Sequence, residues 1–407
     1  MVNLESLIFS QAEGVVHLQQ KLTAARALGP ENGGQGEAAK ARVVEEFLGA
    51  AGISDIQFIN SPDERVESGS RPNIIASING ISKKRLWLFG HMDVVPPGEP
   101  TSWQTDPWLA TRLQDYLYGR GVEDNQQAIT SMLVLAKALH ENGIIPQIGL
   151  GLVFMADEEC GSRHGLDYIL RYNRALFAPY DYYIVPDGGS SDASMIDIAE
   201  KAQLWLKFTV VGRQAHASLP QLGTNSLVAA SHLIIALGQL KEIFPLENPI
   251  FNPPVSTFVP TKYMGNVDAI NIMPGKETFF MDCRLLPGIE PDAVIGSCQE
   301  IAGKIAKKQN VEIVIEVIQK NPATETPPDA QVVRALTAAI EAVYGIKPRL
   351  SGIGGATVAA LLRKAGLPAV VWSCIENTCH QANERSSITA TLKDAAVFGH
   401  ILLDPAA

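Results

Sequence analysis

Leu88-Phe89-Gly90-His91-Met92-Asp93-Val94-Val95-Pro96-Pro97-Gly98 is the stretch that decides the fold of this chain. An apolar run, Leu86 to Phe89, predicts a buried strand that ends at a glycine. Because residues i and i+2 point to the same side of an extended chain, the Asp93 carboxylate can reach the ring of His91. A carboxylate bound to one imidazole nitrogen leaves the other nitrogen free for a metal. We therefore expect His91 to be a metal ligand and Asp93 to orient its ring. Taken alone, the tripeptide His91-Met92-Asp93 could also be a solvated turn without a metal.

Length, composition and charge limit the classes of protein to which the chain can belong. A length of 407 residues favours two domains, and 46% hydrophobic with 19% charged residues indicates a folded globular protein. The formal net charge of -10 argues against nucleic acid or an anionic membrane as a partner. We find no apolar run of membrane-spanning length and no N-terminal signal pattern, so we expect a cytoplasmic protein without membrane contact. The five cysteines do not suggest a disulfide framework.

Strands alternate with helices on both sides of a central segment, which predicts an α/β domain with a mostly parallel sheet covered by helices on each face. This domain is expected to contain residues 1–197 and 322–407. The expected strands are 56–59, 73–78, 85–89, 148–154, 182–185 and 368–372, and the expected helices are 4–23, 36–51, 126–142, 330–344 and 357–365.

Residues 198–321 follow a different pattern and are expected to form an inserted domain. Residues 203–211 alternate strictly, with Leu204, Leu206, Phe208 and Val210 on one face. A helix (226–240), two strands (255–263 and 277–285), a second helix (291–308) and a last strand (311–318) are expected after it. The order βαββαβ is typical of a ferredoxin-like α+β domain.

Further groups that can bind metal stand where His91 stands, after an apolar run or at the start of a helix. They are Asp124, the pair Glu158-Glu159, Asp187 and His380. Each carboxylate alone could be a helix cap or a turn residue. In open α/β sheets, however, ligands bind beyond the carboxyl ends of the strands, so these groups are expected at one edge. Carboxylates gathered there would repel one another without a cation, and the His and carboxylate set suits one or two zinc-like ions.

These motifs together resemble those of a known family. The runs Gly90–Pro96, Gly119–Asp124 and Asp157–Gly161, with the late His380, resemble the co-catalytic zinc exopeptidase and deacylase family. That family includes acetylornithine deacetylase, succinyl-diaminopimelate desuccinylase, aminoacylase and glutamate carboxypeptidase. The resemblance implies a zinc-exopeptidase-like catalytic domain interrupted by a lid and dimerisation domain, and a homodimer formed through that insertion. It also implies two divalent metal ions, zinc in the first place, with cobalt or manganese as alternatives.

The resemblance further implies a role for each group of the site. Asp124 would bridge the two ions, with His91 and Asp187 completing one ligand set and Glu159 and His380 the other.

Glu158 would be the general base in this family scheme, and Asp93 the residue that orients His91. In an extended chain adjacent side chains point in opposite directions, so Glu158 could reach a water while Glu159 holds metal. The family also tends to have a cis peptide bond after the bridging aspartate, here Asp124-Asn125.

Residues of the inserted domain and of a late glycine turn resemble the family's substrate contacts. His216 resembles a histidine that reaches across the dimer and stabilises the oxyanion, with a turn histidine as the alternative. Asn271 and Arg284 resemble substrate-holding residues, and Gly355 lies in the turn that lines the pocket. The planar fork of Arg284 matches a substrate carboxylate, although a salt bridge to Asp282 is the alternative.

We therefore predict a dinuclear metal-dependent hydrolase that cleaves an amide bond of a small molecule bearing a carboxylate. An N-acyl amino acid of the deacetylase or desuccinylase type, or a short peptide, is expected as substrate, with a dipeptidase or carboxypeptidase of the family as the alternative. The sequence departs from the family pattern at Asn125-Gln126-Gln127 and at Ala356-Thr357. The substrate therefore cannot be carried over from any one member of the family. The alternative of a dinuclear metallophosphoesterase is disfavoured because the sequence has no Asp-x-His cluster. The alternative of a non-catalytic metal-binding relative would require a missing ligand or base, and all the candidates are present.

Overall fold

The computed structural model describes residues 3–405, which form two compact units. The first unit comprises the chain up to Ile198, Thr326–Ser351 and the chain from Thr357 onward, and the second comprises Ala199–Glu325 and Gly352–Ala356. We expected the boundaries at 197/198 and 321/322, and we did not expect 352–356 to join the second unit. It does so because Gly352 lies against Phe251, where an added Cβ would be 2.4 Å from the ring.

A nine-stranded sheet, most of which belongs to the first unit, has the strand order β1-β4-β8-β5-β9-β19-β10-β17, with β18 also paired to β10. Its strands are β1 (Ile56–Phe58), β4 (Ile74–Ile78), β5 (Arg85–His91), β8 (Gly149–Met155), β9 (Tyr182–Gly189), β10 (Met195–Glu200), β17 (Thr324–Glu325), β18 (Arg349–Ile353) and β19 (Ala369–Ser373). Neighbours among β8, β5, β9 and β19 are parallel, whereas the β1-β4, β4-β8, β19-β10 and β10-β17 pairs are antiparallel. The expected α/β class is confirmed, but the sheet is mixed and its parallel part is confined to the centre.

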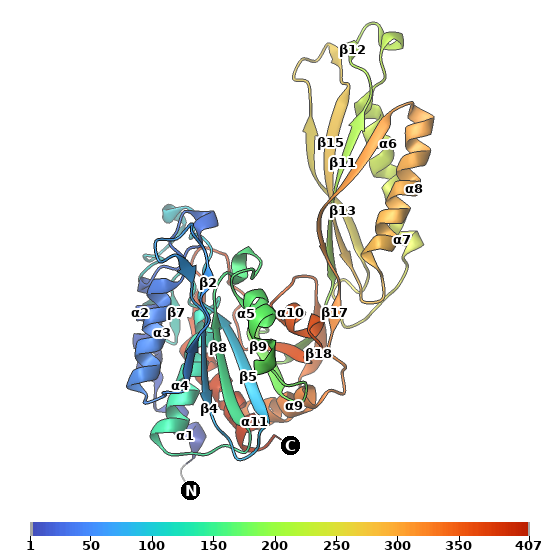
Figure 1. Ribbon diagram of the computed structural model, residues 1–407. Coiled ribbons are helices and arrows are strands. Elements are labelled where there is room, and N and C mark those ends of the chain that lie inside the picture. The colour runs from blue at the N-terminus through green and yellow to red at the C-terminus, as the bar shows by residue number, and fades with distance from the viewer. Residues whose placement is uncertain (1–2, 406–407) are drawn as a thin grey trace. The chain divides into compact units, whose positions relative to one another are not determined.

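Helices cover both faces of this sheet (Figure 1). They are α1 (Leu4–Phe9), α2 (Ala12–Ala24), α3 (Ala38–Ala50), α4 (Gln126–Glu141), α5 (Leu166–Asn173), α9 (Gln331–Tyr344), α10 (Ala359–Lys364) and α11 (Ile388–Leu403). The single helix expected over 4–23 is wrong, because the chain breaks at Ser10 and Gln11 into α1 and α2. Short strands and 3-10 turns complete the unit: β2 (Ser61–Pro62), β3 (Ser70–Arg71), β6 (Thr111–Leu113), β7 (Tyr116–Tyr118), β20 (Arg385–Ser387), η1 (Pro30–Asn32), η2 (Pro100–Ser102), η3 (Glu158–Cys160) and η4 (Arg174–Leu176).

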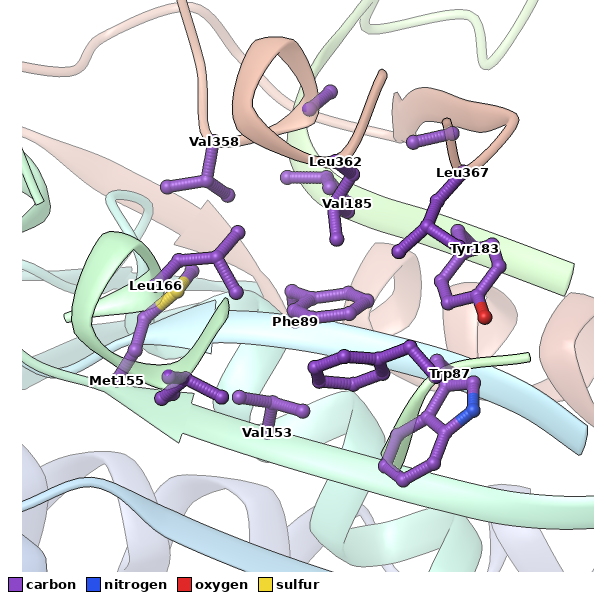
Figure 2. Close-up of a cluster of buried hydrophobic side chains, with 14 of the residues drawn as sticks. Trp87, Phe89, Val153, Met155, Leu166, Tyr183, Val185, Val358, Leu362 and Leu367 are labelled. Carbon is purple, nitrogen blue, oxygen red and sulfur yellow. The ribbon is translucent and has the colours of Figure 1, made fainter. Parts of the chain in front are cut away.

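The opening stretch of the sequence occupies the centre of the sheet. Trp87 and Phe89 of β5 point into a buried apolar cluster with side chains of β8, β9, β19, α5 and α10 (Figure 2). Gly90 has the opposite orientation, and a Cβ there would lie 3.1 Å from Ile129 of α4 and 3.2 Å from the Asn125 Oδ1. The glycine at the end of the predicted strand therefore lets the beginning of α4 approach the end of β5, beside His91.

The second unit is a four-stranded antiparallel sheet in the order β13-β15-β11-β16. Its elements are β11 (Ala202–Val211), β12 (Ala215–His216), η5 (Pro220–Leu222), α6 (Ser226–Leu237), α7 (Leu240–Ile243), β13 (Thr257–Gly265), β14 (Ile272–Met273), β15 (Lys276–Leu285), α8 (Pro291–Gln309) and β16 (Glu312–Asn321). Helices α6 and α8 lie on one face (Figure 1). The strand order is that of the expected ferredoxin-like domain, and Leu204, Leu206, Phe208 and Val210 are buried as their alternation predicts.

One helical stretch of the second unit is long and apolar enough to cross a membrane, although we expected no segment of that length. By length and composition alone, the 18 residues Ser226–Ile243, which include α6 and α7, could cross a bilayer. In this fold 33% of that stretch is buried within the chain, and α6 packs on β11, β15 and α8. The packing is that of a helix covering one face of a sheet.

Candidate metal centre

The predicted metal ligands come from separate strand ends of the first unit. His91 is the last residue of β5, and Asp187 lies within β9, which continues beyond the expected end of that strand. Glu159 follows β8 on the 3-10 turn η3. Asp124 precedes α4, and His380 lies in the loop after β19. Because β5, β8, β9 and β19 are parallel, their carboxyl ends bring these residues to one edge of the sheet.

The Asp124 carboxylate lies between the two histidines. Its Oδ1 is 2.8 Å from His91 Nε2, and its Oδ2 is 3.1 Å from His380 Nε2. Asp187 Oδ1 lies 3.6 Å from the same His91 nitrogen, and Glu159 Oε2 lies 3.1 Å from His380 Nε2. The ligand atoms of each set lie within 4.8 Å of one another. We call His91, Asp124 and Asp187 the first metal group, and Asp124, Glu159 and His380 the second.

The carboxylates change the acidity of both histidines. Burial alone would lower the pKa of His91, but hydrogen bonds to carboxylates, the largest from Asp124, outweigh burial and raise this pKa well above its usual value. Hydrogen bonds to Asp124 and Glu159 raise the pKa of His380 to about 10. Burial raises the pKa of Asp124, and the two histidines outweigh that effect and lower it. A divalent cation would supply the same positive charge, so the donor set fits a metal ion.

Asp93 contacts the His91 ring, as predicted, and has further partners that the sequence did not indicate. His91 Nδ1 lies 3.1 Å from the backbone carbonyl oxygen of Asp93 and 3.4 Å from its carboxylate. The two carboxylate oxygens accept hydrogen bonds from the backbone N–H groups of Glu158 and Glu159, each at 3.0 Å. Asp93 therefore contacts the His91 ring and also fixes the turn that carries both glutamates.

Glu158 and Glu159 do not have the extended geometry that we expected, because both lie in the 3-10 turn η3. A 3-10 helix has about three residues per turn, so neighbouring side chains still point in different directions. Burial, followed by the charge of Asp187, raises the pKa of Glu158 well above its usual value. A carboxylate with a raised pKa can take up and release a proton near neutral pH.

Comparison with known proteins places this geometry in a family. Residues 87–404 match the sequence profile of Peptidase family M20/M25/M40. The chain belongs to this family. It is 35% identical over 406 residues to an uncharacterized metallohydrolase of Methanococcus maripaludis, covering 95% of this chain and 98% of the relative. It is 30% identical to a succinyl-diaminopimelate desuccinylase of a Methylobacterium species, covering 81% of this chain and 82% of the relative.

Solved structures show the same fold. The aminopeptidase PepT of Bacillus cereus superimposes with a TM-score of 0.78 at 20% identity, covering 97% of this chain and 99% of that one. As a member of the M20/M25/M40 family with metallohydrolase relatives, the chain is a metal-dependent amidohydrolase or peptidase. The expected cis peptide bond is confirmed at Asp124-Asn125.

The residues that depart from the family pattern have defined contacts in this member. The Asn125 Oδ1 accepts a hydrogen bond from the backbone N–H of His91 at 3.3 Å, and the Asn125 Nδ2 donates to Asp187 Oδ1 at 2.7 Å. The Gln127 Nε2 donates to the Cys374 carbonyl at 2.7 Å and to Asp394 Oδ2 at 3.1 Å. Asn125 thus links the two strand-borne ligands of the first metal group.

The predicted substrate contacts lie in the second unit and form two local pairs. His216 and Asn271 belong to adjoining segments, where the Ala217 N–H donates to the Asn271 carbonyl at 2.9 Å. The Arg284 Nη1 donates to the carbonyl of Gly354, next to Gly355, at 2.8 Å.

The guanidinium of Arg284 is also engaged by Asp282. Its Nε and Nη2 donate to the two Asp282 carboxylate oxygens at 2.7 and 3.1 Å. The alternative drawn from the sequence, a salt bridge between these residues, is therefore present.

A third group of possible ligands was not predicted, and it consists of Glu31, Asp157 and Cys160. Two arginines neutralise its carboxylates: Arg65 Nη1 lies 2.5 Å from Glu31, and Arg71 Nη1 lies 3.6 Å from Asp157. These contacts make the group part of a salt-bridge network.

Sequence reasoning also missed the buried glutamates that surround the Asp124 loop. Glu384 is 0% exposed and Glu123 is 3% exposed. The only sequence signal for the first is its position four residues after His380, and the second precedes Asp124 directly.

Proposed function

We propose that this protein hydrolyses the amide bond of an N-acyl amino acid, of the deacetylase or desuccinylase type, or of a short peptide. The observation that carries the proposal is the orientation of Asp124, whose two carboxylate oxygens face two histidines from different parts of the chain. Such a carboxylate can bind one cation with each oxygen, as a dinuclear site requires. Relatives named as a desuccinylase and structural neighbours named as peptidases support both substrate classes.

Two divalent ions would be held by the first and second metal groups, with Asp124 shared. When bound, they would lower the pKa of a water and polarise the carbonyl to be cleaved. Zinc suits a set of imidazole and carboxylate ligands best, with cobalt or manganese as alternatives. Metal analysis of the purified protein, followed by reactivation of the metal-free protein with each ion, decides between them.

Glu158 is the proposed general base. Its carboxylate would take a proton from the attacking water and deliver it to the leaving amine, which its raised pKa favours. Asp93 supports this role by fixing the backbone N–H of Glu158.

The second unit is proposed to supply the substrate contacts. His216, which is exposed, would reach across the proposed homodimer and stabilise the oxyanion in the other subunit, while Asn271, Arg284 and Gly355 would contact the substrate. Asp282 and the Gly354 carbonyl fix the orientation of the planar Arg284 guanidinium, whose remaining N–H groups could bind a substrate carboxylate. Arg284→Ala should therefore raise KM more than it lowers kcat.

A homodimer formed through the second unit is part of the proposal, as is a cytoplasmic location. The helix α6 exposes apolar side chains on its surface, with Leu227 43%, Val228 45% and Ile235 76% exposed. Light scattering of the purified chain tests the dimer, and Ile235→Lys should shift it toward the monomer if α6 lies in the interface.

The test of the function is a screen of N-acetyl, N-succinyl and N-carbamoyl amino acids and of dipeptides with metal-loaded protein. Glu158→Gln should lower kcat by about 10²- to 10⁴-fold while the metal content stays at the wild-type value. Glu141→Gln, which changes an exposed glutamate at the end of α4, is the matched control and should keep full activity. A protein that cleaves no amide, or a fully active Glu158→Gln variant, contradicts the proposal.

A further inference from the structure

A buried carboxylate organises the whole loop that carries Asp124. The Glu384 Oε2 accepts hydrogen bonds from the Arg120 guanidinium at 2.5 Å and from the Gly121 N–H at 3.0 Å. Its Oε1 accepts from the N–H groups of Glu123 at 2.9 Å and Asp124 at 3.1 Å. The four bonds suit a carboxylate, because an amide at this position would turn its own N–H groups toward two of the donors.

A second carboxylate makes the reverse connection. The Glu123 Oε2, on the Asp124 loop, accepts from the backbone N–H of Thr378 at 2.5 Å and from its hydroxyl at 2.8 Å. Thr378 lies two residues before His380, and Glu384 lies four residues after it. We call these reciprocal bonds of Glu384 and Glu123 the clasp. The clasp joins the Asp124 loop to the His380 loop on both sides of the histidine.

The two metal groups differ in how much they depend on the clasp. In the first, His91 and Asp187 lie on neighbouring strands of the sheet and are linked by Asn125. In the second, His380 is half exposed and lies outside any strand or helix. Its φ of 62° falls in the left-handed region, which a residue other than glycine keeps only when its surroundings hold it there.

We propose that Glu384 and Glu123 are positioning residues for the second metal group. By joining the two loops, they set the spacing between Asp124 and His380 and so determine the affinity of this group for its ion. The proposal rests on the dinuclear site proposed above. Both glutamates are buried and would act through the ligands that they hold in place.

The experiment is a titration of chelator-treated protein with Co²⁺. Binding is measured by calorimetry and by the visible absorption spectrum of the bound ion. The variants are Glu384→Gln, which preserves shape, and Glu123→Ala, which frees only the Thr378 side. The matched control is Asp181→Asn. Asp181 is 3% exposed and accepts from the Arg85 N–H and the Trp87 indole, at the amino end of β9.

The wild-type protein should bind two equivalents of Co²⁺. Each clasp variant should bind one ion nearly as the wild type does and the other about 10- to 100-fold more weakly, the range typical when the partners of metal ligands are removed. Asp181→Asn should bind both ions as the wild type does. Wild-type affinity for both ions in the clasp variants overturns the proposal. An equal loss of affinity for both ions also overturns it, because the loss of a negative charge alone would produce that result. A wild-type protein that binds fewer than two ions instead overturns the dinuclear site itself.

Discussion

Replacement of Asp93 by asparagine tests how the turn carrying Glu158 and Glu159 is held. Burial raises the pKa of Asp93, but its bonds with His91 and with the two glutamate amides lower the pKa overall, so the group is ionised at neutral pH. Its two oxygens accept one N–H each at 3.0 Å. Asparagine keeps one acceptor oxygen and turns an NH₂ group toward the other N–H.

The magnitude follows from these two hydrogen bonds. A hydrogen bond to a charged group contributes about 1.5–3 kcal/mol, and a buried N–H left without a partner costs about 1–3 kcal/mol. With one bond lost and the other weakened, Asp93→Asn should lower the free energy of unfolding by about 2–4 kcal/mol. Because the turn carries the proposed base and a proposed metal ligand, kcat should fall by about 10²-fold, as a misplacement near 1 Å can cause.

Two measurements check this prediction: urea unfolding, and kcat on the best amide substrate at saturating metal. Asp181→Asn, at the opposite end of the sheet, should lose a similar free energy of unfolding and keep its kcat. If Asp93→Asn keeps wild-type kcat, or if the control loses as much activity, the proposed role of Asp93 in holding the turn is refuted.

Three further predictions concern stability. Chelation of metal should lower the Tm, since an ion present at 100 times its Kd stabilises the fold by about 2.7 kcal/mol, and added Zn²⁺ should restore it; an unchanged Tm would show that no ion is bound. Burial raises the pKa of Asp394 to about 7, so its contribution to stability is full below about pH 4 and is lost, by up to about 4 kcal/mol, as the pH rises through 7. In pH-dependent unfolding Asp394→Asn should flatten this slope, and an unaltered slope would contradict the assignment. Gly189→Ala should destabilise the protein in thermal melts, because φ is +153° and a Cβ would lie 2.0 Å from the Ser373 carbonyl oxygen, whereas a wild-type Tm would show that β9 can shift.

The sequence by itself determined the fold class, the parallel strands at the centre of the sheet and the order of the main elements in the inserted domain. Alternation in 203–211 and apolar runs such as Leu86 to Phe89 depend on which faces of a strand are buried, and that information is local. The residues that end such runs, among them His91 and Asp187, could be expected at one edge because parallel strands share a direction. Some departures are shifts in element bounds, as at the end of β9, and the helix expected over 4–23 breaks at Ser10 and Gln11. Others are whole elements that the patterns did not indicate, among them α5, α11, β10 and β18.

Only the tertiary structure decided which polar groups meet. The antiparallel outer strands pair segments far apart in the chain, such as β10 with β17, and no local pattern specifies that pairing. The same holds for Glu384, which binds a loop 260 residues away. A carboxylate can satisfy its oxygens with any donor that packing brings near, so its partner is set by the positions of distant backbones and not by its sequence neighbours.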